Sequence, residues 1–258
     1  MKTIESIAKT LKGKKVILRL DLNVPLQKKN ITDTNRIDKI IPTLTFLISN
    51  KARILIVSHV GRPKGKIIEG LSMSPICEYL QKKLSQKIHL IKTDINNLNK
   101  KDLFKNEKEN ILMLENLRFF KGEEENDILF AKQLASFGDL YVNDAFSCSH
   151  RKHASVYSIT KFIPSYAGIQ LSSEIGALRN ITKNIVRPVT CIIGGSKIST
   201  KINVIKNLIS KFDNLIFVGG MANNILKYKK FPIGKSVFEE NCENIVEEIF
   251  VSSKKSNC

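Results

Sequence analysis

The sequence contains no apolar run that approaches the roughly 18 residues needed for a membrane-spanning helix. Residues 1–10 lack the apolar core of a secretory signal peptide. The five cysteines are odd in number and scattered, and no two form a CxxC pair. This usage is typical of reduced thiols in a cytosolic protein and disfavours a disulfide framework or a zinc site. We therefore expect a cytoplasmic protein without a membrane partner.

Several familiar motifs are also absent. There is no G-x-G-x-x-G and no G-x-S-x-G, which disfavours a Rossmann dinucleotide fingerprint and an α/β-hydrolase nucleophile elbow. Residues 234–236 (Gly-Lys-Ser) resemble the end of a Walker A loop, but Lys229 stands where that motif requires glycine. No fixed-period repeat or low-complexity linker is evident. The function must therefore be inferred from other features.

Lysine and arginine dominate the charge, and the chain carries a net charge of +18. This balance favours an anionic partner, either nucleic acid or a small phosphorylated molecule, although a lysine-rich surface set by genome composition explains most lysines equally well. Arginine discriminates better, because only eight of the 42 basic residues are Arg. Four arginines lie at or just beyond expected strand ends, where a planar fork can bind phosphate or carboxylate: Arg19, Arg62, Arg118 and Arg151.

Four short apolar runs, each long enough for one buried strand, end abruptly in polar residues. They begin at Val16, Arg53, Ile111 and Asp139, and helical patterns separate them. Continuous apolar runs alternating with helices predict a Rossmann-like α/β fold, a parallel sheet sandwiched by helices. Ligands of such sheets lie outside the carboxyl ends of the strands. The polar groups at the four strand ends are therefore expected to converge on one basic site.

Helical spacing of apolar residues predicts the connecting elements. One helix follows the turn at 31–35, and Pro42 within it predicts either a kink or a helix that begins at that proline. A second helix opens at Ser74-Pro75. The acids at 123–125 predict the first turn of a third helix, which Gly138 closes.

The pattern changes after residue 168. We expect three parts: a first domain over 1–168, an interdomain helix over 169–186 whose helical pattern ends at Asn184, and a partial second domain over 187–258. The second part shows a strand–helix–strand pattern in which both strands end in glycine pairs, at 194–195 and 219–220. Glycine there lets backbone N–H groups approach a phosphate, although glycines at strand ends more often form plain turns.

Some candidate residues admit more than one interpretation. Lys197 and Lys201 are four apart, so we expect them on one face of a first helical turn, as two cations for one polyphosphate would require. His150 and His153 near Asp144 could suggest a metal, but no third ligand has suitable spacing, and anion binding fits better.

At the end of the first run, two further residues are candidates. Asp21 is expected either to pair with Arg19 and fix the loop, or to contact a ligand. Asn23 is the better candidate for ligand contact, because an amide can donate to an anion or hydroxyl.

Together these stretches closely resemble the phosphoglycerate kinase family. The motifs that carry the resemblance occur in the family's order and spacing over essentially the whole chain: RLDLNVP (19–25), VSHVGRPKG (57–65), ENLRFF (115–120), YVNDAFSCSHRKHAS (141–155), GGSKISTK (194–201) and VGGMA (218–222). The resemblance implies a two-domain cytoplasmic enzyme of glycolysis, monomeric when complete. Such an enzyme transfers a phosphoryl group between Mg-ATP or Mg-ADP and the carboxylate of 3-phosphoglycerate, with 1,3-bisphosphoglycerate as the phosphorylated acid.

Matching positions carry the implied site over to this chain. The phosphoglycerate site would comprise Asp21, Asn23, Arg36, His59, Arg62, Arg118 and Arg151. The nucleotide side would comprise Gly195, Lys197, Lys201 and Gly220, with no metal ligand assigned within the chain. The resemblance further implies that closure about the 169–186 helix joins the two sites.

The implied chemistry suits these residue types. The acceptor carboxylate is ionised at neutral pH, since carboxyl pKa values lie near ~4, so no general base is needed. The task is to neutralise charge and align two anions that repel each other. Arg36 and Lys197 could stabilise the phosphoryl group in flight, and losing one such donor costs about 3–4 kcal/mol in the barrier. We therefore expect Arg36→Ala in an intact enzyme to lower turnover far more than substrate affinity.

The sequence departs from the family pattern in places. Val218 stands where a third glycine is usual, which is expected to stiffen one phosphate approach, and Thr200 stands where an acid is common. Residues 147–149 (Ser-Cys-Ser) replace a Gly-Thr-Ala type of segment.

The resemblance stops at Cys258, whereas the family continues with the rest of the second sheet, the adenine and ribose pocket and the acid that helps hold magnesium. We therefore expect a fragment or truncated reading frame, with an unpaired sheet edge and apolar surface in 187–258. Such a chain should bind phosphoglycerate weakly and show little or no kinase activity alone.

Two other classes of protein remain open. The net charge of +18 is also compatible with a nucleic-acid-binding protein, although such a protein should carry basic residues along one helix or aromatics interleaved with basic residues, and aromatics make up only 7% of the chain. A non-catalytic phosphate-binding module, in which only the first domain functions, is the other alternative.

Overall fold

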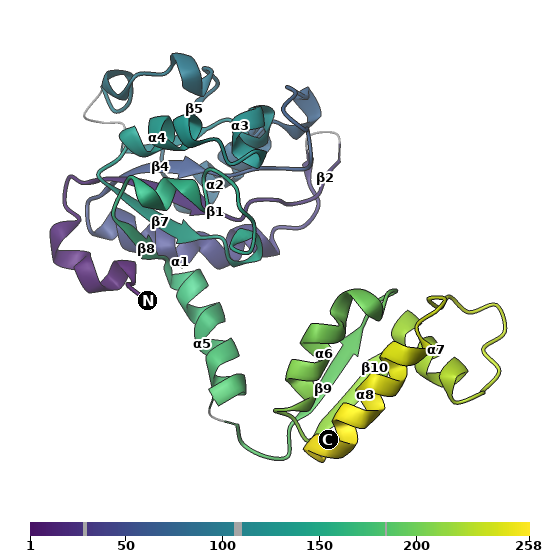
Figure 1. Ribbon diagram of the computed structural model, residues 1–258. Coiled ribbons are helices and arrows are strands. Elements are labelled where there is room, and N and C mark those ends of the chain that lie inside the picture. The colour runs from purple at the N-terminus through teal and green to yellow at the C-terminus, as the bar shows by residue number, and fades with distance from the viewer. Residues whose placement is uncertain (28–29, 106–109, 184) are drawn as a thin grey trace. The chain divides into compact units, whose positions relative to one another are not determined.

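The structure is a computed structural model that describes residues 1–27, 30–105, 110–183 and 185–258. The chain divides into two compact units, Met1–Gly176 and Ala177–Cys258. The division falls inside helix α5 (Ile169–Lys183), and the predicted end of this helix at Asn184 lies outside the described residues (Figure 1). No helix in the described ranges has the length and apolar character needed to cross a bilayer.

The first unit is built on a six-stranded sheet in which every neighbouring pair is parallel. Its spatial order is β5 (His89–Ile91), β6 (Ile111–Leu114), β4 (Arg53–Val57), β1 (Lys15–Leu20), β7 (Leu140–Asp144) and β8 (Ser165–Ala167). The predicted parallel α/β sheet is therefore confirmed. The apolar pattern does not predict the two short edge strands, β5 and β8. A separate two-residue antiparallel pair joins β2 (Leu26–Gln27) to β3 (Asn30–Ile31).

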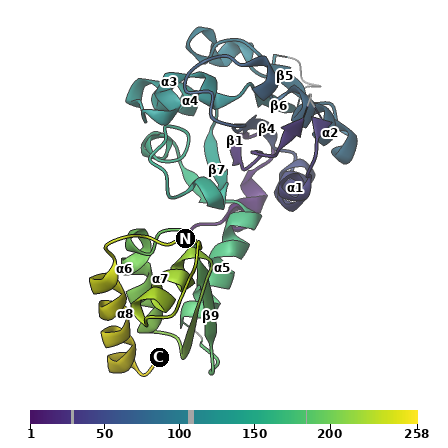
Figure 2. The ribbon, with the colours of Figure 1, turned by 90° about the vertical axis from the view of Figure 1, so that its right-hand side faces the viewer.

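Both faces of the six-stranded sheet are covered. Side chains alternate along a strand, so Val16 and Leu18 of β1 pack with α1 (Asn35–Ser49) and α2 (Ser74–Leu84). Ile17 faces the other way and joins the core beneath α4 (Ile128–Ser136). Figure 2 shows α1 and α2 on one side of the strands and α4 on the other. Each fully buried aliphatic side chain contributes about 1.5–3 kcal/mol, which fixes the sheet that carries the loops described below.

The structure excludes one of the two alternatives for the first helix and corrects the boundaries of a later one. Helix α1 begins at Asn35 and continues through Pro42, so the alternative in which the helix begins at the proline does not hold. The single helix expected between the acids at 123–125 and Gly138 is in fact two helices, α3 (Lys121–Glu124) and α4. The break follows from Asn126, whose φ is +56°, and from Asp127, whose carboxylate accepts the Phe130 N–H at 2.7 Å and starts α4 anew.

Short 3₁₀-helices complete the connections. They are η1 (Ile4–Thr10), η2 (Glu69–Leu71), η3 (Ile95–Asn97), η4 (Lys100–Asp102), η5 (Leu117–Phe119), η6 (Phe146–Cys148), η7 (Ser158–Lys161) and η8 (Ser199–Lys201).

The second unit contains a parallel pair of strands, β9 (Thr190–Gly194) and β10 (Asn214–Val218). Its helices are α6 (Ile202–Ile209), α7 (Gly220–Tyr228) and α8 (Glu243–Ser256). Their apolar sides form a small core around Ile205, Met221 and Val246. The alternate strand residues Ile192 and Ile216 are 66% and 48% exposed, so one face of this sheet presents apolar side chains to solvent.

Candidate functional site

The carboxyl ends of β1, β4, β6 and β7 lie at one edge of the first sheet. In the parallel register, Arg19 near the end of β1 stands opposite Val57 of β4 and Asn143 of β7. The loops that follow these strands therefore leave the sheet side by side. These loops carry all but one of the predicted phosphoglycerate-site residues, and the exception, Arg36, lies in the first turn of α1.

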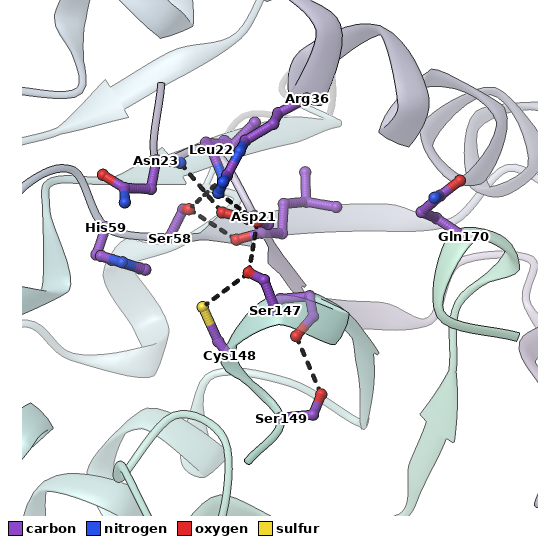
Figure 3. Close-up of polar contacts among 12 residues, drawn as sticks. Asp21, Leu22, Asn23, Arg36, Ser58, His59, Ser147, Cys148, Ser149 and Gln170 are labelled. Carbon is purple, nitrogen blue, oxygen red and sulfur yellow. Dashed lines mark hydrogen bonds and ion pairs between the residues drawn. The ribbon is translucent and has the colours of Figure 1, made fainter. Parts of the chain in front are cut away.

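Asp21, just beyond β1, joins two of these segments. Its Oδ2 accepts hydrogen bonds from Arg36 Nη1 at 2.8 Å and from the Ser147 hydroxyl at 2.6 Å (Figure 3). The three side chains border a cleft of about 180 Å³. In the described part of the chain Asp21 forms no ion pair with Arg19, so that interpretation of Asp21 is wrong. Ser147, one of the departures from the family pattern, thus helps to hold the carboxylate that orients Arg36.

Asn23 ties the loop after β1 to the loop after β4. Its Oδ1 accepts the Gly61 N–H at 2.9 Å, so only its amide nitrogen remains able to donate to a ligand. Gly61 has a φ of +64°, and a Cβ there would lie 2.8 Å from Leu71 Cδ2, which explains the glycine. Arg62 follows directly with an exposed side chain. The hydrogen bond therefore places Asn23 beside the segment that carries Arg62.

Arg118, at η5 after β6, is almost completely buried. Its Nη1 donates to the Gly61 carbonyl at 2.8 Å, and its Nε lies 3.3 Å from Glu124 Oε1. Burial lowers the pKa of Arg118, and the nearby positive charge of Arg151 acts in the same direction. The loops after β4, β6 and β7 therefore meet around one group of cations.

His59 is 2% exposed and lies within the same group. Its Nδ1 is 2.8 Å from Nη2 of Arg19. Burial lowers the pKa of His59 to about 2, and the nearby Arg19, Arg118, His153 and Arg151 add to this effect. The imidazole is therefore neutral at pH 7, and the arginines alone supply positive charge.

The sequence did not predict the buried polar network that lies beneath this group of cations. The network consists of Arg19, Ser58, Glu123 and Ser155, each no more than 1% exposed. The Ser155 hydroxyl donates to Glu123 Oε1 at 2.6 Å, and the Ser155 N–H donates to Oε2 at 2.9 Å. Glu123 therefore does not serve mainly to favour a helix dipole, as its position in an acidic run suggested. The available signal was a serine within two residues of a histidine, in Ser58-His59 and in His153-Ala154-Ser155.

The histidines after β7 show no metal geometry. His153 Nδ1 lies 3.9 Å from Glu123 Oε1, and the described residues contain no group of three His, Cys, Asp or Glu side chains suited to a metal ion. Asp144 instead caps α5, because its Oδ1 accepts the Leu171 N–H at 2.8 Å. A Cβ at Gly168 would collide with this carboxylate, so glycine is required there. Burial raises the pKa of Asp144.

The predicted nucleotide-side residues lie in the loops after β9 and β10. Gly195 and Gly220 pack closely: the Met221 N–H donates to the Gly195 carbonyl at 3.0 Å, and a Cβ at Gly220 would lie 3.1 Å from that oxygen. A Cβ at Gly195 would lie 3.8 Å from Lys201 Nζ, so this ammonium is near the glycine loop. Val218 departs from the family pattern, in which a third glycine is usual at this position. Its Cγ2 would lie 2.7 Å from a Cβ built on Gly194, so the valine side chain fills space next to Gly194 that a glycine at 218 would leave empty.

Lys197 is placed differently from Lys201. Lys197 precedes η8 in an irregular segment, whereas Lys201 is the last residue of η8, so the expected shared first helical turn is wrong. Hydrogen bonds from Ser199 lower the pKa of Glu239, and the charge of Lys197 contributes to that shift. The exposed Lys197 side chain therefore lies near Glu239.

A comparison with known proteins extends these observations. The family model described as phosphoglycerate kinase matches residues 4–258. Proteins named phosphoglycerate kinase from Wolbachia sp. subsp. Drosophila simulans (strain wRi) and Orientia tsutsugamushi (strain Ikeda) are 43% and 44% identical to the chain over 248 residues. These alignments cover 96% of the chain but only 62% and 61% of the relatives, so the chain spans about three fifths of their length.

Solved structures agree with the sequence relatives. A phosphoglycerate kinase structure from Coxiella burnetii matches 96% of the chain and 62% of its own length, with a TM-score of 0.84 and 37% identity. The structure of phosphoglycerate kinase from Pyrococcus horikoshii OT3 matches 100% of the chain and 64% of its own length, with a TM-score of 0.79 and 25% identity.

Proposed function

The chain belongs to the phosphoglycerate kinase family, and from this premise we propose that its first unit binds 3-phosphoglycerate. The protein would transfer a phosphoryl group between ATP or ADP and the carboxylate of that acid. The observation that carries the proposal is the meeting of His59, Arg118 and Arg151 at the carboxyl edge of the first sheet. A small acid with a phosphate at one end and a carboxylate at the other suits this collection of donors.

The residues divide the work by their chemistry. Arg62, Arg118 and Arg151 would bind the phosphate, since guanidinium groups match its oxygens with paired N–H donors. Asn23 would donate its amide N–H to the hydroxyl or carboxylate, because its oxygen is already used by Gly61. The acceptor carboxylate is ionised at neutral pH, so the site has to neutralise charge and to align the reacting groups, not to remove a proton.

The second unit would hold the nucleotide. Its two glycine loops lie at the carboxyl ends of parallel strands, and Lys201 Nζ lies near the bare Cα of Gly195, which fits a bound polyphosphate. Gly195, Lys201 and Gly220 would therefore line the phosphates. Bound Mg-ATP would supply the transferable phosphoryl group, with Mg²⁺ offsetting part of its charge. The described residues contain no cluster of three acids for the metal, so no magnesium ligand is assigned to this chain.

Arg36 and Lys197 are the proposed catalytic residues. Arg36 is half-exposed and oriented by Asp21, and Lys197 is exposed in a loop after β9. Both could donate to the phosphoryl group as it transfers, when its charge is spread over three oxygens. In a full-length enzyme carrying these residues, Arg36→Ala should lower kcat by about 10²–10³-fold while the affinity for phosphoglycerate changes far less. Turnover close to wild type would exclude this role for Arg36.

Binding provides the direct test for the chain itself. We expect isothermal titration with 3-phosphoglycerate to saturate, and Arg62→Ala to weaken the affinity by about 10–100-fold, the loss of one charge-assisted contact. Arg179→Ala, at an exposed position of α5, is the matched control and should leave the affinity unchanged. Tight binding of random duplex DNA without affinity for 3-phosphoglycerate would overturn the proposal. An ATP titration and a coupled turnover assay test the nucleotide side separately.

We further infer that the protein acts in the cytoplasm and as a monomer. All five cysteines are free, and Cys77, Cys148 and Cys242 are buried, as suits a reducing compartment. Cell fractionation and sedimentation of the protein test these two inferences.

A further inference from the structure

Arg19 is the most buried cation of the first unit, and the proposed binding roles do not use it. Its side chain is 1% exposed, although a buried charge is costly unless it is paired. It is the second-last residue of β1, two residues before Asp21, at the edge of the sheet where the other arginines gather.

The contacts of Arg19 involve all three nitrogens of its guanidinium. Nε donates to the Ser155 hydroxyl at 3.1 Å, and Nη1 donates to the Leu20 carbonyl and to the Ser58 hydroxyl at 3.3 Å. The Ser155 hydroxyl in turn donates to Glu123, so a serine connects the buried cation to a buried anion. The remaining nitrogen, Nη2, lies 2.8 Å from His59 Nδ1.

The contact with His59 has only one possible direction. A guanidinium has donors and no acceptor and stays protonated in proteins, so Nη2 must donate and His59 Nδ1 must accept. An imidazole that accepts at Nδ1 carries its proton on Nε2. Within the described part of the chain, no protein group hydrogen-bonds to Nε2. That N–H is therefore available to a ligand that binds near His59, Arg118 and Arg151.

We propose that Arg19 is a positioning residue that holds His59 with its proton on Nε2, so that His59 offers one fixed N–H donor to an oxygen of the bound acid. The ligand part rests on the proposed binding of 3-phosphoglycerate, and the tautomer part does not. The partner of this N–H is an oxygen without a proton, such as a carboxylate or phosphate oxygen, or a hydroxyl oxygen. His59 thus contributes direction to recognition, while the arginines contribute charge.

The groups that face His59 support an uncharged imidazole. Arg19 approaches from β1, Arg118 from η5, and Arg151 and His153 from the segment after β7, and all of these groups oppose protonation of His59. Two acids face this group of residues: Glu124 Oε1 lies 3.3 Å from Arg118 Nε, and Glu123 Oε1 lies 3.9 Å from His153 Nδ1. A positive charge on His59 would lie directly against the positive charge of Arg19. Recognition by His59 should therefore not depend on pH between 6 and 8.

Nitrogen-resolved NMR of the four histidine side chains in the ligand-free 258-residue chain tests the tautomer directly. We expect His59, identified with His59→Gln, to show the neutral Nε2–H pattern without titration from pH 5.5 to 8. Arg19→Met should let His59 titrate in this range and mix the two tautomers. Ser155→Ala removes a different Arg19 contact and should leave the tautomer as in wild type. A wild-type His59 that titrates, or that carries its proton on Nδ1, would overturn the proposal even if Arg19→Met fails to fold.

Affinity measurements test the ligand part. His59→Leu should weaken 3-phosphoglycerate binding at least tenfold, whereas His59→Gln, whose amide can also donate, should recover most of that loss. Equal affinities for the two variants would contradict a donor role. If wild-type His59 shows the Nε2–H tautomer but 3-phosphoglycerate does not bind, the proposed function fails and the tautomer assignment stands.

Discussion

The two units of the chain use the same apolar strand pattern with different results. In the first unit, five of the six residues of β1 are buried, and side chains on both faces of the sheet lie in a core. In the second unit, β10 alternates between exposed and half-buried residues, although its sequence Asn-Leu-Ile-Phe-Val is equally apolar. A cavity of about 480 Å³ beside β10 is lined by apolar side chains such as Ile225 and Phe250.

The difference shows that an apolar run predicts a strand but not its cover. A parallel strand needs helices on both of its faces. Strand β1 has them, so Ile17 and Leu18 are both buried. Strands β9 and β10 have a core on one face only, so Ile192 and Ile216 on the other face are exposed. The polar residues follow the same division. The first unit buries charged groups in a connected network, while the ion pairs of the second unit lie near the surface.

The largest expected difference is between the stability effects of replacing one isoleucine in each unit. Ile17→Ala should destabilise the first unit by about 3–4 kcal/mol, because it leaves a cavity in a fully buried strand. Ile216→Ala should change the second unit by less than about 0.5 kcal/mol, since half of this side chain is already exposed. Urea unfolding followed by tyrosine fluorescence reports the first unit, which holds four of the five tyrosines, and amide exchange reports the second. Equal costs would remove the contrast.

A smaller difference is expected between two glutamates. Glu123→Gln should cost about 2–3 kcal/mol, because an amide cannot accept from both the Ser155 N–H and hydroxyl and leaves Arg19 less compensated. Glu248→Gln breaks an exposed pair with Lys206 and should cost under about 1 kcal/mol. The same unfolding and exchange measurements apply. A silent Glu123→Gln would show that the buried network contributes nothing to stability.

Acidification should also separate the units. Unfolding returns the pKa of His59 from about 2 to its ordinary value near 6.5, so the unfolded state binds a proton that the folded state does not. Stability should therefore fall as pH decreases through 6.5, by about 1.4 kcal/mol between pH 7.5 and 5.5. The pKa of His153 is also lowered by burial, which adds to the fall, whereas the raised pKa of Asp144 opposes it.

The control for this pH effect is built into the chain. All four histidines precede residue 177, so the second unit should keep its stability over the same range. His59→Gln should reduce the slope of the first unit by about one proton. A slope unchanged by His59→Gln, measured by urea unfolding at each pH, would show that another group controls the effect.

The smallest expected change in stability concerns the exposed face of β9 and β10. Ile192→Thr should alter stability by less than about 0.5 kcal/mol, yet it should reduce binding of an apolar dye such as ANS and slow self-association. Ile68→Thr, at a 43% exposed position of the first unit, is the control and should leave dye binding unchanged. Equal effects of the two variants would show that the face is not a distinct apolar surface.

The sequence predicted the parts of the fold that depend on local pattern. The runs beginning at Val16, Arg53 and Ile111 became parallel neighbours, because continuous apolar strands need cover on both faces. The acids at 123–125 misled the helix assignment, since Asn126 adopts a positive φ and Asp127 caps a new helix. Helix α1 continues through the exposed Pro42, where the local sequence left a kink and a new helix start both open.

The sequence predicted which strand ends contribute to the candidate site, but not the network beneath them. Asp21, His59 and Arg118 follow strand ends, and the general position of ligands in parallel sheets brings such residues together. The network beneath could not be predicted, because Arg19 and Ser155 are 136 residues apart and Glu123 and Ser155 are 32 apart. The pairing of Arg36 with Asp21 likewise depends on where α1 begins relative to β1.

The central place of β1 has a consequence for biosynthesis. This strand is translated first, yet the Lys15 N–H bonds to Asp139 across 124 residues, at the start of the neighbouring β7. At about 5–20 residues per second, the ribosome needs about 6–25 s to produce that partner. Throughout this delay the nascent β1 can pair on one side only and keeps an open apolar edge. Chaperone protection during translation would therefore matter more for this strand than for any strand made after it.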